Sequence, residues 1–458
     1  MPRDANPLFL SADTMALATD LYELTMAAGY YHAGLNEPAT FEMFVRKLPP
    51  NRSYLLVAGL EQVVHYLRHV RFSGKAVDYL RAQPVFANVG DEFFDYLRAF
   101  RFTGDLHAMP EGTVAFAGEA LVRVTAPLIE AQLVETYLLA TVNFQTLVAT
   151  KASRVVAAAQ GRAVVDFGTR RAHGPQAGYA AARAAYIGGC VGTSNVLAGY
   201  ELGIPISGTQ AHSWVMAFDT EEHAFQAYYD VFPDSTVLLL DTYDSIAATH
   251  KAIAFGPSLR GVRLDSGDLA AQSRRVRKIL DAAGLHDTRI FASSDLNEYR
   301  IDALLKKGAK LDAFGVGTDL VTSRDAPALA GVYKLVELQR DGEPAPCVKQ
   351  SAAKKTYPGR KQVRRLSDKR GRYRRDVICL DHEDCGGEAL LVPVLRRGKL
   401  VGELPSLEAI QQRAGEALAL LPPRFRRFKG AEQYPVSISP GLEALRTQAV
   451  GHVKRAKA

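Results

Sequence analysis

The sequence has little of several features that would place it in a specialised class of protein. Its four cysteines follow no disulfide-framework spacing, which favours a reducing compartment. No apolar run approaches the roughly 20 residues that cross a bilayer. The first residues, MPRDANPLFL, lack the basic region and long apolar run of a secretory signal. We therefore expect a cytoplasmic protein with no membrane partner.

Familiar catalytic motifs are missing as well. The sequence contains no G-x-x-x-x-G-K-[ST], no H-E-x-x-H and no G-x-S-x-G. Five residues separate Cys379 from Cys385, which is a weak pattern for zinc, so we predict no metal ligand in the chain, the alternative being a cysteine–zinc site in the C-terminal appendage. The GGCVGT at 188–193 lacks a full dinucleotide-binding fingerprint and follows a helical stretch, so it is interpreted as a helix break near the site.

The composition is that of an ordinary globular protein, with 47% apolar and 23% charged residues. Its net charge of +7 is local: residues 349–375 hold twelve Lys or Arg and one Asp, or +11, which leaves −4 for the rest. A nucleic-acid-binding module is one interpretation of this segment. With two aromatics, Tyr357 and Tyr373, and no recognisable binding fold, it is disfavoured, and we expect no nucleic-acid partner.

From residue 162 onward, short β-rich runs alternate with helix-compatible stretches, a pattern typical of a parallel sheet covered by helices. Seven such strands would nearly close a barrel, and the N-terminal part would supply an eighth. We thus predict an α/β fold: an irregular, incomplete (β/α) barrel at 151–340, an N-terminal α+β region at 1–150 that partly completes it, and a basic flap with a small β-rich appendage at 341–458. The seven predicted strands are 164–167, 204–209, 237–244, 261–268, 289–295, 311–318 and 332–338.

Polar side chains follow the predicted strands where each one ends, and ligands of parallel α/β sheets bind at that edge. The sequence therefore predicts a site there. Its strand-end residues are Asp166, Thr209, Asp241, Asp265, Ser293 and Thr318.

Gly315, Gly317 and Thr318 form a glycine-rich turn at the end of the predicted strand 311–318. Such a turn lets backbone N–H groups and the start of a helix approach an anion, although it is equally consistent with a simple tight turn. Arg263 and Asp265 are two positions apart on a strand and so project to the same side. They would bind a substrate carboxylate and a ribose hydroxyl, or else form a buried salt bridge.

Two further candidates lie near strand ends. Arg170 and its neighbour Arg171 suit a phosphate or pyrophosphate, the alternative being a solvated surface. His212, in SGTQAHSW, is either a structural side chain or a base and nucleophile, because its imidazole is largely unprotonated near neutral pH. These residues together indicate an enzyme that binds an anionic, phosphorylated substrate.

Eight segments in order resemble the nicotinate phosphoribosyltransferase family and span residues 19–361. They are TDLYELTMAAGYY, FEMFVRKLP, VDFGTRRAHG, GTQAHSWVMAF, LLDTYD, GVRLDSGDL, FGVGTDLVTS and KKTYPGRK. The resemblance implies an incomplete α/β barrel, a homodimer, and an ATP-coupled, ligase-type reaction of NAD salvage. In that reaction, nicotinate and phosphoribosyl pyrophosphate give nicotinate mononucleotide and pyrophosphate, while ATP is hydrolysed through a phosphohistidine.

The resemblance also implies roles for individual residues. His212 matches the phosphohistidine, and Asp265 is expected beside the ribose. Tyr22, Thr209 and Arg263 match nicotinate contacts. Thr356 matches a phosphoribosyl pyrophosphate contact, which favours a cationic flap over the substrate phosphates. Arg170, Gly315, Gly317 and Thr318 match positions around the ribose and phosphates.

Mg²⁺ or Mn²⁺ is the implied cofactor and ATP the cosubstrate, with the metal held mainly by substrate oxygens. The rival within the family is nicotinamide phosphoribosyltransferase, which carries an Asp that receives the amide where this sequence has Ser194. That difference favours the acid as substrate. Quinolinate phosphoribosyltransferase is disfavoured because it is shorter and needs no phosphohistidine.

Overall fold

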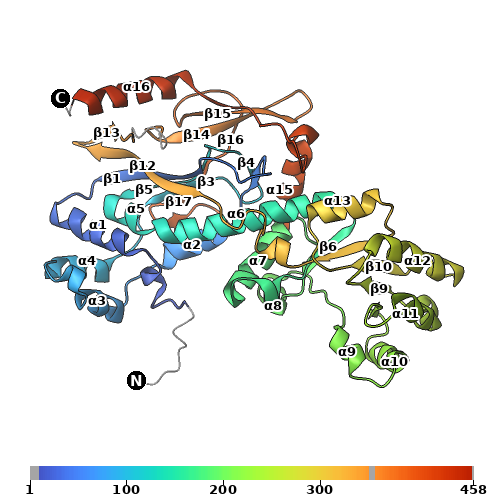
Figure 1. Ribbon diagram of the computed structural model, residues 1–458. Helices are drawn as coiled ribbons and strands as arrows, with labels where there is room; N and C mark the ends of the chain where they lie inside the picture. Colours follow the sequence, from blue (N-terminus) through green and yellow to red (C-terminus); the bar gives the residue numbers. More distant parts are fainter. Residues whose placement is uncertain (1–9, 350–355, 456–458) are drawn as a thin grey trace.

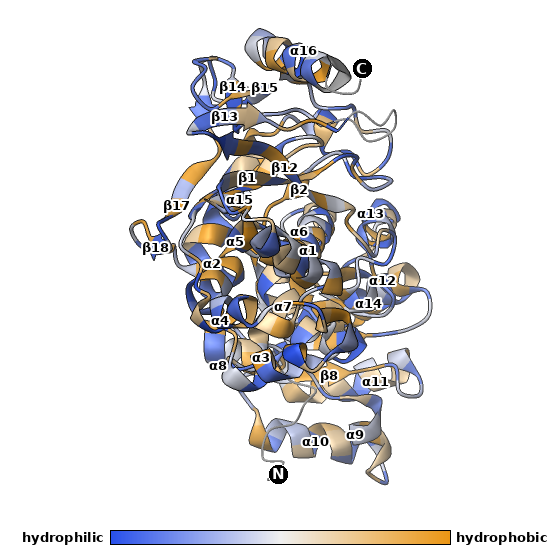
Figure 2. Ribbon diagram, turned by 90° about the vertical axis from the view of Figure 1, so that its left-hand side faces the viewer, coloured by the Kyte–Doolittle hydropathy of each residue, from blue (hydrophilic) through white to orange (hydrophobic). Residues whose placement is uncertain are grey.

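A computed structural model describes residues 10–349 and 356–455 of the protein. One large antiparallel sheet lies among the helices of the N-terminal third, and a parallel sheet with its own helices lies beside it (Figure 1). In Figure 2, α9 (His212–Met216) and α10 (Glu221–Val231) lie at the opposite end of the molecule from α16 (Pro440–Arg455). No helix in the described ranges combines the length and the apolar character that a membrane crossing needs.

Within the described part of the chain, seven strands form the antiparallel sheet. In spatial order they are β13 (Glu343–Pro346), β12 (Gly331–Arg340), β1 (Pro38–Val45), β5 (Ala120–Pro127), β3 (Asp105–Ala108), β17 (Val392–Arg396) and β18 (Lys399–Leu400). The helices of this region are α1 (Leu21–His32), α2 (Leu60–His69), α3 (Gly74–Arg81), α4 (Asp91–Ala99) and α5 (Leu128–Leu133). Helix α5 packs on β1 and β5. Apolar side chains from these helices and strands form a continuous buried core.

The parallel sheet has six strands among the described residues. In spatial order they are β7 (Gly192–Thr193), β6 (Ala163–Asp166), β11 (Ala313–Val316), β10 (Arg289–Ala292), β9 (Gly261–Leu264) and β8 (Val237–Leu239). From β8 to β11 the neighbouring strands of the sheet follow one another in chain order. Strand β11 also pairs with β6, which comes first of these strands along the chain. Between them lie α7 (Pro175–Ile187), α8 (Val196–Leu202), α11 (Ser245–Ala252), α12 (Leu269–Ala282) and α13 (Glu298–Lys306), with α14 (Thr318–Val321) after β11. No described strand pairing joins the two edge strands, β7 and β8.

The long helix α6 (Glu135–Ala158) connects the two regions. Its Thr150 hydroxyl accepts a hydrogen bond from the Leu56 N–H at 2.9 Å, next to the short ribbon of β2 (Leu55–Leu56) and β4 (Val114–Ala115). The next residue, Lys151, pairs with Glu298 of α13 at 2.6 Å. The predicted domain limit at residue 150 falls inside this helix, so the chain continues without a linker from one region into the other.

The C-terminal part is a four-stranded sheet among residues 356–455, in the order β16 (Glu388–Ala389), β14 (Lys361–Ser367), β15 (Tyr373–Leu380) and β19 (Val436–Ile438). Helices α15 (Leu407–Leu420) and α16 accompany it. Much of the basic segment forms the β14–β15 hairpin. Arg365 there is buried and pairs with Asp376 at 2.6 Å, so part of the charge is neutralised within the protein. Residues 350–355, part of the predicted flap, lie outside the described residues.

Five of the predicted parallel strands are confirmed, as β6, β8, β9, β10 and β11. The segment 332–338 is a strand, but its place in the parallel series was wrong, because β12 pairs antiparallel with β1. Its Lys334 and Glu337 are only partly buried, which suits a strand with one solvated face rather than a parallel strand covered on both. The segment 204–209 makes a single bridge, from Ile206 to Thr193. Among the described residues, the N-terminal strands β1, β3 and β5 join the antiparallel sheet, β2 and β4 pair with each other, and none supplies an eighth parallel strand.

Candidate active site

A cavity of about 330 Å³ opens beyond the carboxyl ends of β6, β9, β10 and β11, at the edge that the sequence predicted. Nine of the residues predicted for the site line it: Arg170, Arg171, Thr209, Arg263, Asp265, Ser293, Gly315, Gly317 and Thr318. The rest of the lining is Phe167, Ser194, Gly208, Ser294 and Asp295. Arginines, hydroxyls and carboxylates from six separate segments thus meet in one space.

The glycine-rich turn forms the floor of this cavity between β11 and α14. A Cβ on Gly315 would lie 2.4 Å from the Phe167 ring, so a larger residue would displace that ring from its stack on Phe291. Gly317 precedes Thr318, which begins α14. Because α14 is a single turn of four residues, its dipole is small, and the local N–H groups provide most of any attraction for an anion.

Arg263, on β9, is the most deeply placed cation of the cavity. Its Nη1 donates to the Thr209 hydroxyl and to the Gln210 carbonyl, the latter at 3.2 Å. Burial lowers the pKa of its guanidinium, although Asp265 and Asp241 act in the opposite direction. Its Nη2 is 3.8 Å from Asp265, and its buried Nε has no hydrogen-bond partner among the described residues. Arg263 therefore retains donor capacity for an anion, which a closed salt bridge would not.

Asp241 links the loop after β9 to His212. Its Oδ2 accepts hydrogen bonds from the Asp265 N–H at 3.0 Å and the Ser266 hydroxyl at 2.5 Å. Its Oδ1 lies 3.4 Å from Nε2 of His212, the first residue of α9. Asp265 in turn accepts a hydrogen bond from the Ser293 hydroxyl. Asp241 ends the run VLLLD, and that strand-end position was the only sequence signal for its contact with His212.

Asp166, another strand-end residue, has a structural role. Its two carboxylate oxygens accept hydrogen bonds from Gly168 N–H and Thr193 Oγ1, both at 2.8 Å, which joins the ends of β6 and β7. Burial raises the pKa of this carboxyl group. The neighbouring Arg170 instead lines the cavity, where its charge contributes to the lowered pKa of Arg263.

Of the described residues predicted for the site, five lie outside the cavity lining: Tyr22, Asp166, His212, Asp241 and Thr356. His212 is 39% exposed at its side chain and reaches the cavity residues through Asp241. Tyr22 is exposed on α1, which Figure 1 shows far from β9 and β10. Thr356 is buried beside Lys349, whose N–H donates to its hydroxyl at 3.0 Å.

Ser294 and Asp295 are cavity residues that sequence reasoning missed. Ser294 has a φ of 119°, a conformation that costs a non-glycine residue about 1–3 kcal/mol. Strain of this kind persists where the surrounding structure imposes it. Here the strained residue lies in the loop after β10, which forms part of the cavity wall. The only sequence signal for these two cavity residues was the cluster of polar residues at the end of the run RIFASSD.

The fold and the cavity define an α/β protein with an arginine-lined cavity at the carboxyl ends of parallel strands, the edge at which proteins of this class bind ligands. Residues 17–143, 162–382 and 384–446 match the nicotinate phosphoribosyltransferase (NAPRTase) N-terminal domain, the NAPRTase family and the nicotinate phosphoribosyltransferase C-terminal domain. The chain belongs to the nicotinate phosphoribosyltransferase family.

Its relatives match over nearly their whole length. The chain is 46% identical to nicotinate phosphoribosyltransferase pncB2 of Mycobacterium tuberculosis over 432 residues, which cover 93% of this chain and 91% of that protein. It is 39% identical to the nicotinate phosphoribosyltransferase of Bacillus subtilis, with 96% of each chain covered. The crystal structure of human nicotinic acid phosphoribosyltransferase aligns with a TM-score of 0.83 at 31% identity, covering 94% of this chain and 99% of that one.

Proposed function

We propose that the protein joins nicotinate to phosphoribosyl pyrophosphate, forming nicotinate mononucleotide and pyrophosphate, and couples this to hydrolysis of ATP to ADP and phosphate. The observation that carries the proposal is Arg263, largely buried at a strand end and held on one side by Thr209, while its Nη2 lies 3.8 Å from Asp265 and is left for a carboxylate. A guanidinium suits the planar carboxylate of nicotinate. The names of the relatives support the same substrate.

The parallel sheet supports an incomplete barrel. Its strands follow chain order around the sheet once the pairing of β11 with β6 is included. The segment after α8 spans the open side, because Ile206 bridges to Thr193 of β7 and the Gln210 amide donates to Val237 O of β8 at 3.5 Å. Thr209 lies on this segment, which explains how it faces Arg263 across the opening.

The remaining charges suit a phosphorylated sugar. Arg170 and Arg171 would bind phosphate oxygens, while Asp265 would face the ribose and stabilise the positive charge that develops there as pyrophosphate leaves. Asp265 and Asp295 are hard oxygen donors on the cavity wall, so together with substrate phosphates and water they fit Mg²⁺. When bound, that ion would neutralise charge on the pyrophosphate.

His212 is the proposed acceptor of the ATP γ-phosphoryl group. Asp241 beside Nε2 favours the tautomer protonated there, which leaves the Nδ1 lone pair to attack phosphorus. The N–P bond forms as the bond to ADP breaks, and water later releases the phosphate. The phosphorylated side chain would carry about two negative charges next to the loop of Asp265 and would rearrange the cations of the cavity.

Incubation with γ-labelled ATP tests this step. We expect acid-labile label on the wild-type protein and none on His212→Asn, which keeps a similar shape but lacks the nucleophilic nitrogen. The Asp241→Asn variant should label slowly, since the amide no longer favours the reactive tautomer. Full labelling of the His212→Asn variant would place the phosphorylated residue elsewhere, whatever the fate of nicotinate.

Ser194 supports the acid over the amide as substrate. It lines the cavity and brings no negative charge toward the position of a substrate carboxylate. We expect turnover of nicotinate and none of nicotinamide, and a Ser194→Asp variant should lose nicotinate turnover because it sets two carboxylates against each other. Equal use of both substrates by the wild type would contradict the acid-specific assignment.

A homodimer would account for Tyr22 and Thr356, which one chain leaves outside its own cavity. Exposed apolar residues gather on α1, at Leu21 and Met26, and on α8, at Val196 and Leu197. Contact between such faces of two copies would bury them and bring α1 of one chain to the cavity of the other. Mixing the Tyr22→Ala and Arg263→Ala chains should then restore about a quarter of wild-type activity, because half of the dimers regain one intact site.

A further inference from the structure

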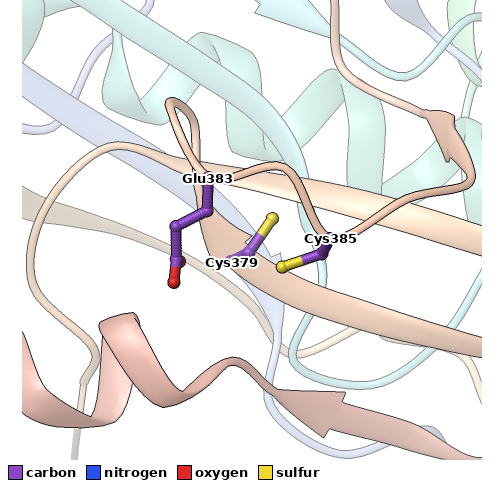
Figure 3. A group of neighbouring side chains, drawn as sticks. All are labelled: Cys379, Glu383 and Cys385. Atoms are coloured by element: carbon purple, nitrogen blue, oxygen red, sulfur yellow. The ribbon is translucent and has the colours of Figure 1, made fainter.

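A second cluster of reactive side chains lies at the end of β15, in the C-terminal sheet. Cys379 is the penultimate residue of that strand, and the chain turns so that Glu383 and Cys385 return to its side. One ligand atom from each residue, two sulfurs and a carboxylate oxygen, lies within 4.8 Å of the others. Figure 3 shows the two sulfur atoms facing each other under the loop that carries Glu383. Both cysteines are free thiols.

The backbone of this loop is ordered by its own hydrogen bonds. The Asp381 N–H donates to Arg360 O, and the Glu383 N–H donates to Leu380 O, both at 3.0 Å. Gly386 and Gly387 follow with φ of 67° and 74°, values that glycine adopts without strain. The three side chains are therefore held close together before any ligand arrives.

Hydrogen bonds hold one carboxylate oxygen of Glu383 in place and leave the other one without a donor among the described residues. Its Oε2 accepts the Leu380 N–H at 2.7 Å and the Ser439 hydroxyl at 2.6 Å. Its Oε1 accepts no hydrogen bond from the described residues. Ser439 directly precedes α16, and its hydroxyl also accepts the Leu442 N–H at 3.2 Å. A hydrogen bond of this kind to a coordinating carboxylate is typical of metal sites.

We propose that Cys379, Glu383 and Cys385 bind one Zn²⁺ ion, with water as the fourth ligand of a tetrahedral site. Thiolates favour zinc or copper(I), and the carboxylate adds a harder donor that favours zinc. Zinc bonds of about 2.0–2.3 Å place tetrahedral ligand atoms some 3.3–3.8 Å apart, so small side-chain rotations suffice from the present spacing. Two thiols lose their protons on binding, and the site with its ion carries one negative charge.

The zinc site would lie in the C-terminal sheet, well separated from the cavity at the parallel strands (Figure 1). An ion there would cross-link the end of β15 to its own turn and, through Glu383 and Ser439, to the start of α16. The consequence is structural: zinc should raise the melting temperature and leave the KM for nicotinate unchanged.

The test uses the full chain, purified under reducing conditions and stripped of metal by a chelator. Added Zn²⁺ should remain at one ion per chain after desalting, and Co²⁺ as a probe should give thiolate-to-cobalt charge-transfer absorption. Cys379→Ser and Cys385→Ser should each abolish that absorption, whereas Cys347→Ser, a change at another partly buried free cysteine, should not. Absence of the absorption, or its survival in Cys379→Ser, would overturn the proposal.

Glu383→Gln separates loss of a ligand from loss of structure. The amide oxygen can still accept from Leu380 and Ser439, so the metal-free variant should melt at the wild-type temperature while zinc binds at least about tenfold more weakly. Ser439→Ala should weaken zinc by about tenfold through Glu383. Unchanged zinc affinity in Glu383→Gln, or rapid formation of a Cys379–Cys385 disulfide in place of metal binding, would show that the assigned ligands are wrong.

Discussion

Two arginines, Arg183 buried and Arg263 largely buried, show how the same residue type serves two purposes in this protein. Arg183, on α7, donates to both oxygens of Glu111 at 2.7 and 2.8 Å and to Glu61 at 2.6 Å. Burial acts to lower its pKa, but the two carboxylates outweigh that effect and raise it. Arg263 faces a hydroxyl, a carbonyl and one carboxylate at 3.8 Å, and burial lowers its pKa.

The two arginines differ in how much of their positive charge the protein itself compensates. Arg183 holds α7 against the loop of Glu111, and its charge is fully compensated inside the protein. Arg263 is partly desolvated beside an open cavity without a close carboxylate, so its charge remains available to an incoming anion. Burial of a charge is therefore a poor guide to function by itself, and the geometry of its partners decides.

Arg183→Met should have the largest effect on stability. The substitution leaves the Glu111 carboxylate buried without its partner, which costs about 3–5 kcal/mol of unfolding free energy. Urea denaturation would measure the loss, and the KM for nicotinate of the folded fraction should not change. Adding Glu111→Gln should recover much of the stability; if the double variant is as unstable as the single one, the ion pair is not the cause.

Arg263→Ala should leave the unfolding free energy within about 0.5 kcal/mol and raise the KM for nicotinate about 30-fold, near 2 kcal/mol, since a charge-assisted hydrogen bond to the carboxylate is lost. Steady-state kinetics with nicotinate and ATP varied separately would measure it. Arg263→Lys should recover little because an ammonium group lacks the planar pair of donors. Equal increases in the KM for ATP and for nicotinate would instead indicate a structural salt bridge.

The third comparison concerns a carboxylate without a cation. Glu23 is fully buried and accepts hydrogen bonds from Thr19 and Thr136, and burial raises its pKa to about 7. Burial also acts to raise the pKa of Glu111, but Arg183 holds it below its usual value.

These shifts predict opposite pH dependences. Because the folded protein binds a proton at Glu23 more tightly than the unfolded chain does, the stability from this group falls as pH rises from about 4.5 through 7. Glu23→Gln should therefore gain about 2.5 kcal/mol more over the wild type at pH 8 than at pH 5, by urea denaturation. Stability from Glu111 is present above pH 4.5 and is lost as pH falls through its lowered pKa. A constant difference between the Glu23→Gln variant and the wild type across pH would refute the assignment to Glu23.

Local patterns were sufficient to predict the carboxyl-end site. The strands β6, β9, β10 and β11 are short apolar runs that end in polar residues, and the residues at those ends meet as expected. The contact of His212 with Asp241 could not be predicted, since it joins residues 29 positions apart through a loop of no periodicity. Strand β7 has two residues, too few for a pattern. The apolar residues of β12 identify a strand but not its partner, and its pairing with β1 depends on contacts nearly 300 residues away. The roles of Tyr22 and Thr356 came from family resemblance alone, because neither has a local chemical signal.

The helix α6 sets a mechanical limit on how this protein can move. With 24 residues it is about 36 Å long, and its middle is tied by Thr150 to β2 and by Lys151 to α13. A hinge between the two sheets would have to break a buried ion pair and bend a continuous helix at the same time. Any opening of the cavity would therefore have to come from local loops, such as the segment 204–211. A second copy docked on α1 would keep a fixed position relative to the cavity of the chain that carries that helix.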